Sequence, residues 1–246
     1  MAFYQTSNPA FRKDTFTRSN ATGATMTLNG TVHKTGILLL LTMASAAWTW
    51  RILTTQGAEA ATPWMWGGLI GGFIISLVTI FVNRAAPITA PIYAVLEGFA
   101  LGGISNALNQ QYHGIAIQAT VITFGALLTM LALYASGAVR ATPGFVKFVV
   151  VATGTVCLVY VIDMILHLFG IGVPFINDSG AMGIGFSIFV VILATLNLVL
   201  DFGMIEQGAQ EGAPKYMEWY GAFAIMVTLV WLYLEVLRLL AKTNRR

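Results

Sequence analysis

Charged residues are scarce in this chain. Of its 246 residues, 13 are Lys or Arg and 10 are Asp or Glu, so that 9% are charged and 57% are hydrophobic. A soluble domain has roughly 25% charged residues, which cover its surface. The composition therefore excludes a soluble enzyme, a nucleic-acid-binding protein and a secreted disulfide-rich domain. It indicates an integral membrane protein.

Several catalytic and cofactor patterns are also missing. The single cysteine, Cys157, lies in an apolar stretch and provides no disulfide framework. There is no HExxH motif, no Cys/His cluster and no phosphate-binding P-loop. The hydrophobic stretches contain lysine only near their ends, at Lys147 and Lys242, so the lysine that binds retinal in a pigment is absent. We therefore expect no enzymatic activity and no resident cofactor.

The N-terminal stretch is polar and lacks the apolar core of a secretory signal peptide. Its basic residues are Arg12, Lys13, Arg18 and Lys34. We predict a polar, flexible segment over residues 1–35 and a single transmembrane domain over residues 36–246. The first hydrophobic span is then an uncleaved signal anchor.

Seven stretches approach or exceed the roughly 20 apolar residues that a membrane-spanning helix needs. They are Ile37–Trp50, Trp64–Val82, Ile92–Leu108, Ile115–Gly137, Phe145–Phe169, Ala181–Gly203 and Trp219–Ala241. The connections are short and contain helix-breaking prolines, which leaves no room for a soluble domain. The predicted fold is all-α, a polytopic bundle of seven transmembrane helices.

The distribution of Lys and Arg predicts the orientation. If the spans alternate, eight basic residues lie on the side of the N-terminus and five on the other. The eight are Arg12, Lys13, Arg18, Lys34, Arg84, Arg140, Lys147 and Lys215, and the five are Arg51, Arg238, Lys242, Arg245 and Arg246. This imbalance favours a cytoplasmic N-terminus. The basic C-terminal tail argues against it, so either the tail is translocated or one segment does not cross completely.

Glycines at helical spacing predict close helix packing in the second and third spans. Gly67 and Gly71, Gly68 and Gly72, and Gly98 and Gly102 are each four residues apart. Small residues let helix backbones approach closely in lipid, where hydrophobic burial drives association weakly. Ordinary tight packing is the favoured interpretation, and a flexible gate or unwound segment is the alternative.

Four acidic residues lie within predicted spans: Glu97, Asp163, Asp201 and Glu235. A charge near the bilayer centre costs about 2.5 kcal/mol or more, so an intramembrane carboxylate is a candidate functional group. Glu97 has no basic residue within four positions. It therefore either meets a partner from another helix or is protonated and links two helices.

Two of these acids have charged neighbours on their own helical face. Asp163 precedes His167 by four residues, a spacing that suits either a proton relay or a structural cap at the membrane interface. Glu235 and Arg238 are three residues apart and can neutralise each other. Thr228 lies seven residues before Glu235, on nearly the same face.

Asp201 stands at the end of the sixth predicted span, where acidic residues accumulate. Glu206, Glu211 and Glu218 follow it, with Lys215 as the one basic residue among them. Clustered oxygen ligands at a helix end can bind a hard cation, so Asp201 is a candidate Ca²⁺ contact. An acidic, solvated loop is the alternative.

Several stretches together resemble the Bax inhibitor-1/YccA family. They are LEGFALGGIS at Leu96–Ser105, the pair Leu200–Asp201, LYLEVLRLL at Leu232–Leu240, and MTLNGTVHKTG at Met26–Gly36, which is similar to the start of one bacterial branch. The resemblance extends over nearly the whole chain from about Met26. It implies a bundle with the last helix at its centre, in a bacterial plasma membrane.

The resemblance also implies a function and a gate. Members of the family are described as pH-sensitive Ca²⁺ leak channels, in which one aspartate on span six and one on span seven hold the pore closed. Neighbouring carboxylates share a proton, so such a pair senses pH. Asp201 matches the first aspartate, whereas Thr228 stands where the second would be. Glu235 or Glu97 is then the candidate replacement.

The sequence thus predicts passive permeation of Ca²⁺ or another cation past Asp201, with Glu97 and Glu235 as further acids of the path. Asp163, Glu206, Thr228 and Arg238 are secondary candidates. Two alternatives stay open: a proton- or cation-coupled carrier, and a non-transporting regulator that binds another membrane protein, such as a protease. The expected partners are the lipid bilayer and such a membrane protein, not nucleic acid.

Overall fold

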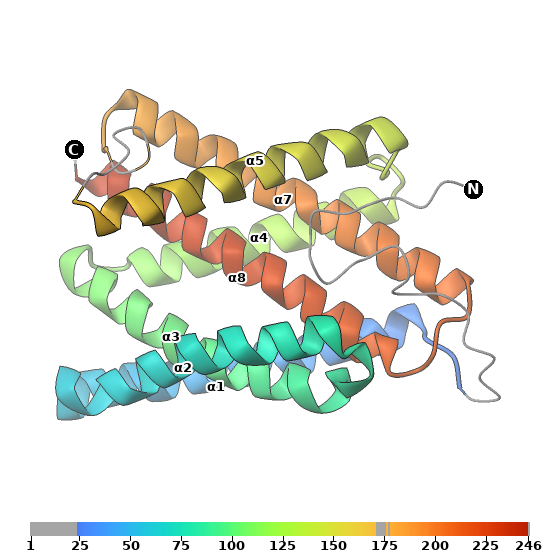
Figure 1. Cartoon of the computed structure of the whole chain (residues 1–246), viewed down its shortest axis with the longest axis horizontal. Coiled ribbons are helices and arrows are strands. Elements are labelled where there is room, and N and C mark those ends of the chain that lie inside the picture. Colours follow the sequence, from blue (N-terminus) through green and yellow to red (C-terminus); the bar gives the residue numbers. More distant parts are fainter. Residues whose placement is uncertain (1–23, 171–175, 177, 246) are drawn as a thin grey trace. The chain divides into compact units, whose positions relative to one another are not determined.

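The computed structural model describes residues 24–170, 176 and 178–245, which form long α-helices (Figure 1). The elements are α1 (Leu28–Gln56), α2 (Ala58–Phe81), the 3-10 turn η1 (Asn83–Ala85), α3 (Ala86–Gln111), α4 (Ile115–Ala135), α5 (Pro143–Leu168), α7 (Ala181–Gln210) and α8 (Met217–Asn244). Seven helices in this described part are long and apolar enough to cross a membrane. This confirms the predicted all-α class with seven spans.

Local sequence signals account for several helix ends. The hydroxyl of Thr27 accepts a hydrogen bond from the backbone N–H of Gly30 at 3.0 Å, which caps the start of α1. Thr142 caps α5 in the same way, and Pro143 follows as its first residue. Gly57, with a φ of 90°, is the one residue between α1 and α2. Such a backbone angle suits glycine, so α1 and α2 can be joined by this single residue.

Most helices, α1 and α7 among them, are longer than the apolar stretches predicted. The first span was expected at Ile37–Trp50, whereas α1 covers Leu28–Gln56, so the last residues of the predicted flexible segment are helical. Residues 1–23 of that segment lie outside the described residues. The sixth span was expected to end at Gly203, whereas α7 continues to Gln210. Hydropathy detects the apolar middle of a helix and misses the polar turns beyond it.

The described residues divide into two compact units, a finer division than the single domain predicted. Unit 1 comprises residues 112–203 and 228–245, and unit 2 comprises residues 24–111 and 204–227. The helices α7 and α8 therefore each contribute to both units. Each unit is described by itself below.

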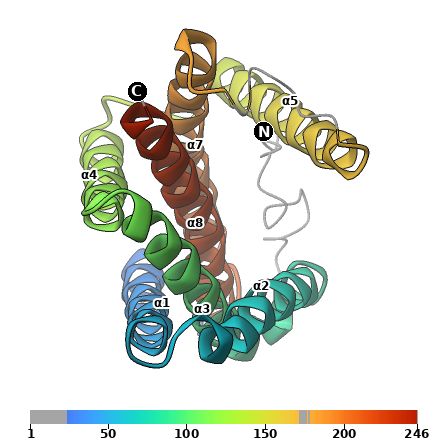
Figure 2. The same ribbon diagram turned by 90° about the vertical axis from the view of Figure 1, so that its left-hand side faces the viewer.

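In unit 2, the glycines of α2 and α3 lie at close helix contacts. The helix α3 packs against both α1 and α2 (Figure 2). A Cβ atom at Gly68 would lie 2.9 Å from the backbone nitrogen of Ala100, and one at Gly98 would lie 3.0 Å from the carbonyl carbon of Thr42. The Thr42 hydroxyl donates to the carbonyl of Ala94 at 3.0 Å. These contacts favour the interpretation of tight packing over that of a flexible gate.

In unit 1, α5 and α7 share an apolar core. Its buried members are Val146, Val149, Val156, Val190, Leu193 and Leu200. One polar contact accompanies them, because the side-chain amide of Asn197 donates to the hydroxyl of Thr153 at 2.9 Å. A satisfied amide of this kind can hold two helices together in an apolar setting.

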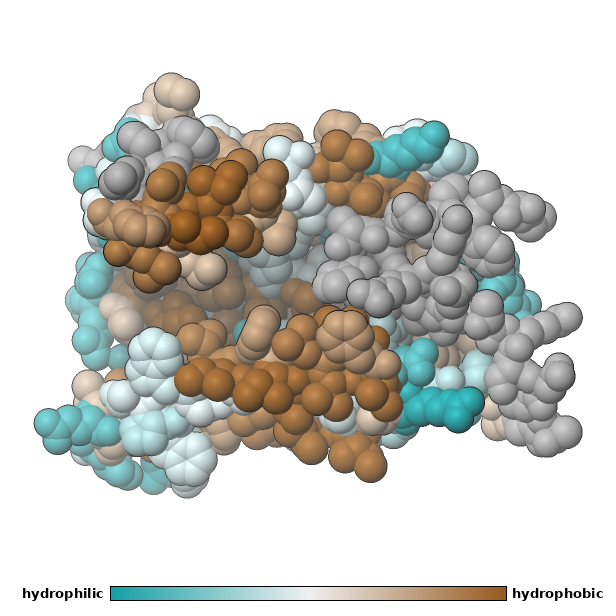
Figure 3. Space-filling model, in the orientation of Figure 1, coloured by the Kyte–Doolittle hydropathy of each residue, from teal (hydrophilic) through white to brown (hydrophobic). Residues whose placement is uncertain are grey.

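The outer faces of α2 and α5 are apolar, as expected for helices in lipid. Of the 18 most apolar consecutive residues in each helix, only 17% are buried in α2 and 11% in α5. Large hydrophobic side chains such as Phe73, Phe81 and Leu158 are exposed there, and brown side chains dominate these regions in Figure 3. Exposed Trp48 and Trp66 lie near the junction of α1 and α2. Tryptophans at a helix end are typical of a membrane–water interface.

Candidate functional site

A buried carboxylate of unit 1 connects α7 to α8. The Asp201 side chain is 0% exposed and Thr228 is 4% exposed. The Thr228 hydroxyl donates to Oδ2 of Asp201 at 2.6 Å, a short hydrogen bond of the kind that carboxylates accept. The structure thus places Thr228 against Asp201, where the family resemblance puts a second aspartate.

This pair lies well inside both helices. Asp201 is nine residues before Gln210, the end of α7, and Thr228 is eleven residues after Met217, the start of α8. At 1.5 Å per residue these separations are about 14 and 16 Å. The prediction that Asp201 stands at a helix end was therefore wrong, because the polar last turns of α7 were taken for a loop. Asp201 is therefore buried within the protein, away from the ends of both helices.

Glu235 of α8 is neutralised by partners in unit 1. Nη1 of Arg238 lies 3.0 Å from Oε1 of Glu235, and the Tyr160 hydroxyl donates to Oε2 at 2.9 Å. The Arg238 guanidinium also lies over the Tyr160 ring, 4.7 Å from its centroid. The predicted pairing of Glu235 with Arg238 is confirmed geometrically. Both carboxylate oxygens of Glu235 therefore have partners within unit 1.

Lys242, near the end of α8, is more buried than the sequence indicated. It is 5% exposed and donates to the carbonyl of Gly183 at 3.0 Å and to the Ser187 hydroxyl at 2.8 Å, both on α7. The sequence places Lys242 near the end of the last hydrophobic stretch. Its partners precede it by more than fifty residues, so no local pattern could have shown the contact.

Glu97 lies in unit 2, on the face of α3 that meets α2. It is half-buried. A Cβ atom at Gly72 would stand 3.0 Å from Oε2 of Glu97, so the glycine leaves room for this carboxyl group. Within the described part of the chain, no lysine, arginine or histidine pairs with Glu97.

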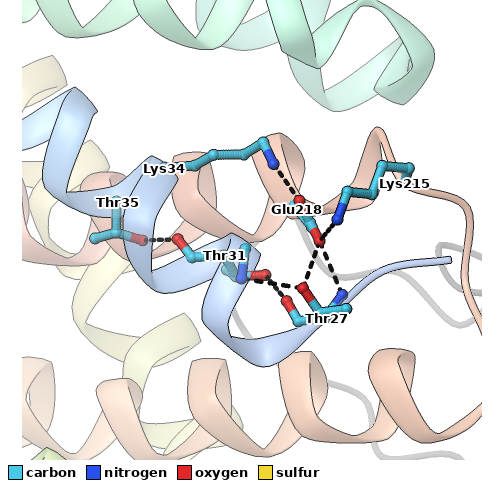
Figure 4. A network of polar contacts seen from close by, with 7 residues as sticks. Thr27, Thr31, Lys34, Thr35, Lys215 and Glu218 are labelled. Atoms are coloured by element: carbon cyan, nitrogen blue, oxygen red, sulfur yellow. Dashed lines mark hydrogen bonds and ion pairs between the residues drawn. The ribbon is translucent and has the colours of Figure 1, made fainter. Parts of the chain in front are cut away.

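Glu218, which sequence analysis assigned to an acidic stretch, is the centre of a buried polar network (Figure 4). It is 0% exposed. Its carboxylate pairs with Lys34 of α1, lies 2.7 Å from Nζ of Lys215, and accepts hydrogen bonds from the N–H and the hydroxyl of Thr27 at 2.9 and 2.8 Å. Only the contact with Lys215 could be expected from the sequence, because Lys215 is three residues from Glu218. The others span more than 180 residues of chain.

The remaining candidates lie nearer to helix ends. Asp163 is half-buried in the last two turns of α5, and His167 is exposed in the final turn. Glu206 is half-buried on α7, where the Gln210 amide donates to it at 3.5 Å. Their functional roles stay predictions.

The acidic stretch does not gather into one cation site. Within residues 24–170, 176 and 178–245, no three His, Cys, Asp or Glu side chains come close enough to hold a metal ion together. Glu211 instead accepts a hydrogen bond from the Gln207 amide at 2.8 Å, and Glu218 is surrounded by its lysines. A Ca²⁺ contact at Asp201 alone stays a prediction.

Comparison with known proteins decides the family. The model of the Bax inhibitor 1 like family matches residues 8–245, which is nearly the whole chain. The chain belongs to this family. No curated protein and no solved structure matches it. The predicted family is thereby confirmed, and the match agrees with a multi-pass membrane protein.

In this Bax inhibitor 1 like protein, three of the four acids in the predicted spans have different neighbours. Glu235 has a cation beside it, Asp201 accepts a hydrogen bond from a neutral hydroxyl, and Glu97 faces a glycine. A cation beside a carboxylate compensates its charge, whereas a hydroxyl stabilises it through a hydrogen bond.

Proposed function

We propose that this protein lets Ca²⁺, or a similar cation, cross the membrane passively, with Asp201 as the gate. The observation that carries the proposal is the fully buried Asp201 carboxylate and its hydrogen bond from Thr228, in a protein of the Bax inhibitor 1 like family. The Asp201 carboxylate accepts a hydrogen bond from the neutral hydroxyl of Thr228. Breaking this contact frees an oxygen ligand of the kind that Ca²⁺ prefers.

The gate works by exchange of partners at Asp201. In the closed state, Thr228 donates to Asp201 and keeps α7 and α8 together. In the open state, the carboxylate binds the passing cation instead, and a proton competes with the cation for the same oxygens. This competition gives the flux its pH dependence. Glu97 and Glu235 are secondary acids in this scheme. Glu235 contributes less to it, because Arg238 already neutralises its charge.

The protein's membrane and its orientation are also part of the proposal. We infer a bacterial plasma membrane from the resemblance to a bacterial branch of the family, and a cytoplasmic N-terminus from the excess of Lys and Arg on that side. Permeation through a gate requires neither a catalytic residue nor a resident cofactor, so the proposed protein is not an enzyme.

The test is Ca²⁺ flux into dye-loaded proteoliposomes at two pH values. Asp201→Asn keeps the size of the side chain and removes its charge. Glu59→Gln makes the corresponding change at an exposed acid in the first turn of α2, outside the candidate residues, and serves as the control. We expect flux that changes with pH in the wild type and in Glu59→Gln, and a response that is lost in Asp201→Asn. Unchanged flux and pH response in Asp201→Asn would falsify the gate.

Two other outcomes select the alternatives. Flux that saturates at low concentration together with uptake of a counter-substrate would indicate a coupled carrier. Folded protein that carries no Ca²⁺ at either pH, yet co-purifies with a stoichiometric membrane-protein partner, would indicate a regulator.

A further inference from the structure

Glu97 is isolated from other charges in unit 2. Between Ala86 and Gln111, α3 contains no other charged residue, and α2 contains only Glu59 in its first turn. The other charged or titratable side chains on the helices of this unit are His33, Lys34, Arg51, Arg84, Glu206, Glu218 and Tyr220, with Tyr93 on α3 itself. Glu97 is therefore the one carboxyl group in the middle of the α1, α2 and α3 helices.

The nearest basic groups lie too far along their helices to pair with it. On α1, the residues that contact the neighbouring Gly98 are Thr42 and Ser45. Lys34 is eight residues before Thr42 and Arg51 is six residues after Ser45, which is about 12 and 9 Å along the helix axis. Lys34 is in addition paired with Glu218.

The immediate surroundings of Glu97 are small or aromatic. Gly72 of α2 faces its carboxyl group, and the buried Tyr93 lies one turn earlier on α3. The Tyr93 ring packs edge-to-face on Phe223, 5.0 Å between centroids. Among the described residues, no hydrogen-bond donor from α1, α2 or the adjoining part of α8 reaches the Glu97 carboxyl group.

An ionised carboxylate in such a setting is unfavourable, because among the described residues neither a cation nor a hydrogen-bond donor compensates its charge. A carboxylic acid has no such charge to compensate. We propose that Glu97 is a proton-binding site of the membrane-spanning part of unit 2, and that Gly72 is a positioning residue that leaves the space for the protonated carboxyl. The ligand of this site is a proton, not Ca²⁺. The inference does not depend on the proposed leak or on Asp201.

A hydrophobic carbodiimide tests this directly on the full-length protein in lipid vesicles. The reagent reacts with protonated carboxyls: the carboxyl proton moves to one carbodiimide nitrogen, the oxygen adds to the central carbon, and the acyl group then migrates to nitrogen, so that no atom leaves. Mass spectrometry locates the adduct. We expect it at Glu97 and not at Glu235, which is paired with Arg238.

The rate of labelling should depend on pH. Above the pH at which the site is half-protonated, the rate should fall about tenfold for each added pH unit, since the protonated fraction falls in that proportion. Glu97→Gln should abolish the adduct. Gly72→Ala should slow labelling several-fold, because the added methyl group occupies the space of the carboxyl oxygen. Gly67→Ala, whose Cβ meets nothing within 4 Å, is the matched control on the same helix and should label as the wild type does.

Three results would overturn the inference. One is the absence of a Glu97 adduct in the folded wild type at every pH. Another is equal labelling by a water-soluble carbodiimide, which would place the carboxyl in water. The third is protection of Glu97 by Ca²⁺ at constant pH, which would make it a cation site. None of these concerns the Asp201→Asn flux, so the two proposals fail independently.

Discussion

At the scale of single residues, the partner of Asp201 determines how the proposed gate can behave. A second carboxylate would share a proton with Asp201 and titrate together with it. Thr228 supplies instead a neutral donor at 2.6 Å, which has no ionised form at physiological pH. The contact therefore contains one titratable group, and its pH response should follow the binding of a single proton.

Thr228→Val tests how much the Thr228–Asp201 hydrogen bond contributes to stability. Valine keeps the shape of threonine but removes this hydrogen bond to the buried carboxylate, so we expect a loss of about 1–3 kcal/mol in the free energy of unfolding. Thr228→Ser keeps the hydroxyl and should lose less. Denaturant unfolding in detergent measures both, and Ca²⁺ flux should rise in the valine variant if the contact holds the gate closed. Equal stability of wild type and Thr228→Val would show that the bond contributes little.

At the scale of elements, the starts of α1 and α8 are joined outside the helices as well as through Glu218. The backbone N–H of Met26 donates to the carbonyl of Ala213 at 2.7 Å, and that of Lys215 donates to Ala24 at 3.1 Å. This short antiparallel contact brings the segment before α1 alongside the connection between α7 and α8. The Glu218 network lies directly beside it and links the two helices.

Gly30→Ala is a specific probe of this junction. Its Cβ would collide with the Glu218 carboxylate, so Glu218 must move away from Lys34 and Thr27. We expect a loss on the order of 1–3 kcal/mol, as for other overpacked sites. Gly36→Ala on the same helix meets nothing within 4 Å and should be neutral or slightly stabilising, because alanine favours a helix over glycine. Thermal unfolding of both variants in detergent measures the difference, and an unchanged Gly30→Ala would contradict the described contact.

The elements also show which features a sequence can reveal. The seven spans were predictable because runs of apolar residues identify them, and the Glu235–Arg238 pair because both residues lie on one helical turn. The Lys34–Glu218 and Lys242–Ser187 contacts were not predictable, since each joins helices distant in the chain. Thr228 is an intermediate case: the family resemblance placed it beside Asp201 although nothing local did.

At the scale of the whole molecule, two contacts agree with alternating spans. Lys34 at the start of α1 and Lys215 before α8 both contact Glu218, so these two helix starts are on the same side. Lys242 at the end of α8 contacts Gly183 at the start of α7, which places that end and that start together. Both agree with the sides assigned when Lys and Arg were counted.

Seven complete spans put the beginning of α1 and the end of α8 on opposite sides of the membrane. The test uses a Cys157→Ser background, because Cys157 is exposed, with one new cysteine at a time: Asn29→Cys in the first turn of α1 or Thr243→Cys in the last turn of α8. A membrane-impermeant maleimide applied to spheroplasts, whose plasma membrane is intact, should label Thr243→Cys. Asn29→Cys should react only after permeabilisation, because the excess of basic residues predicts a cytoplasmic position for its side. Labelling of both cysteines from outside, or of neither, would mean that one helix does not cross the membrane completely, and the basic tail would then lie on the same side as Lys34.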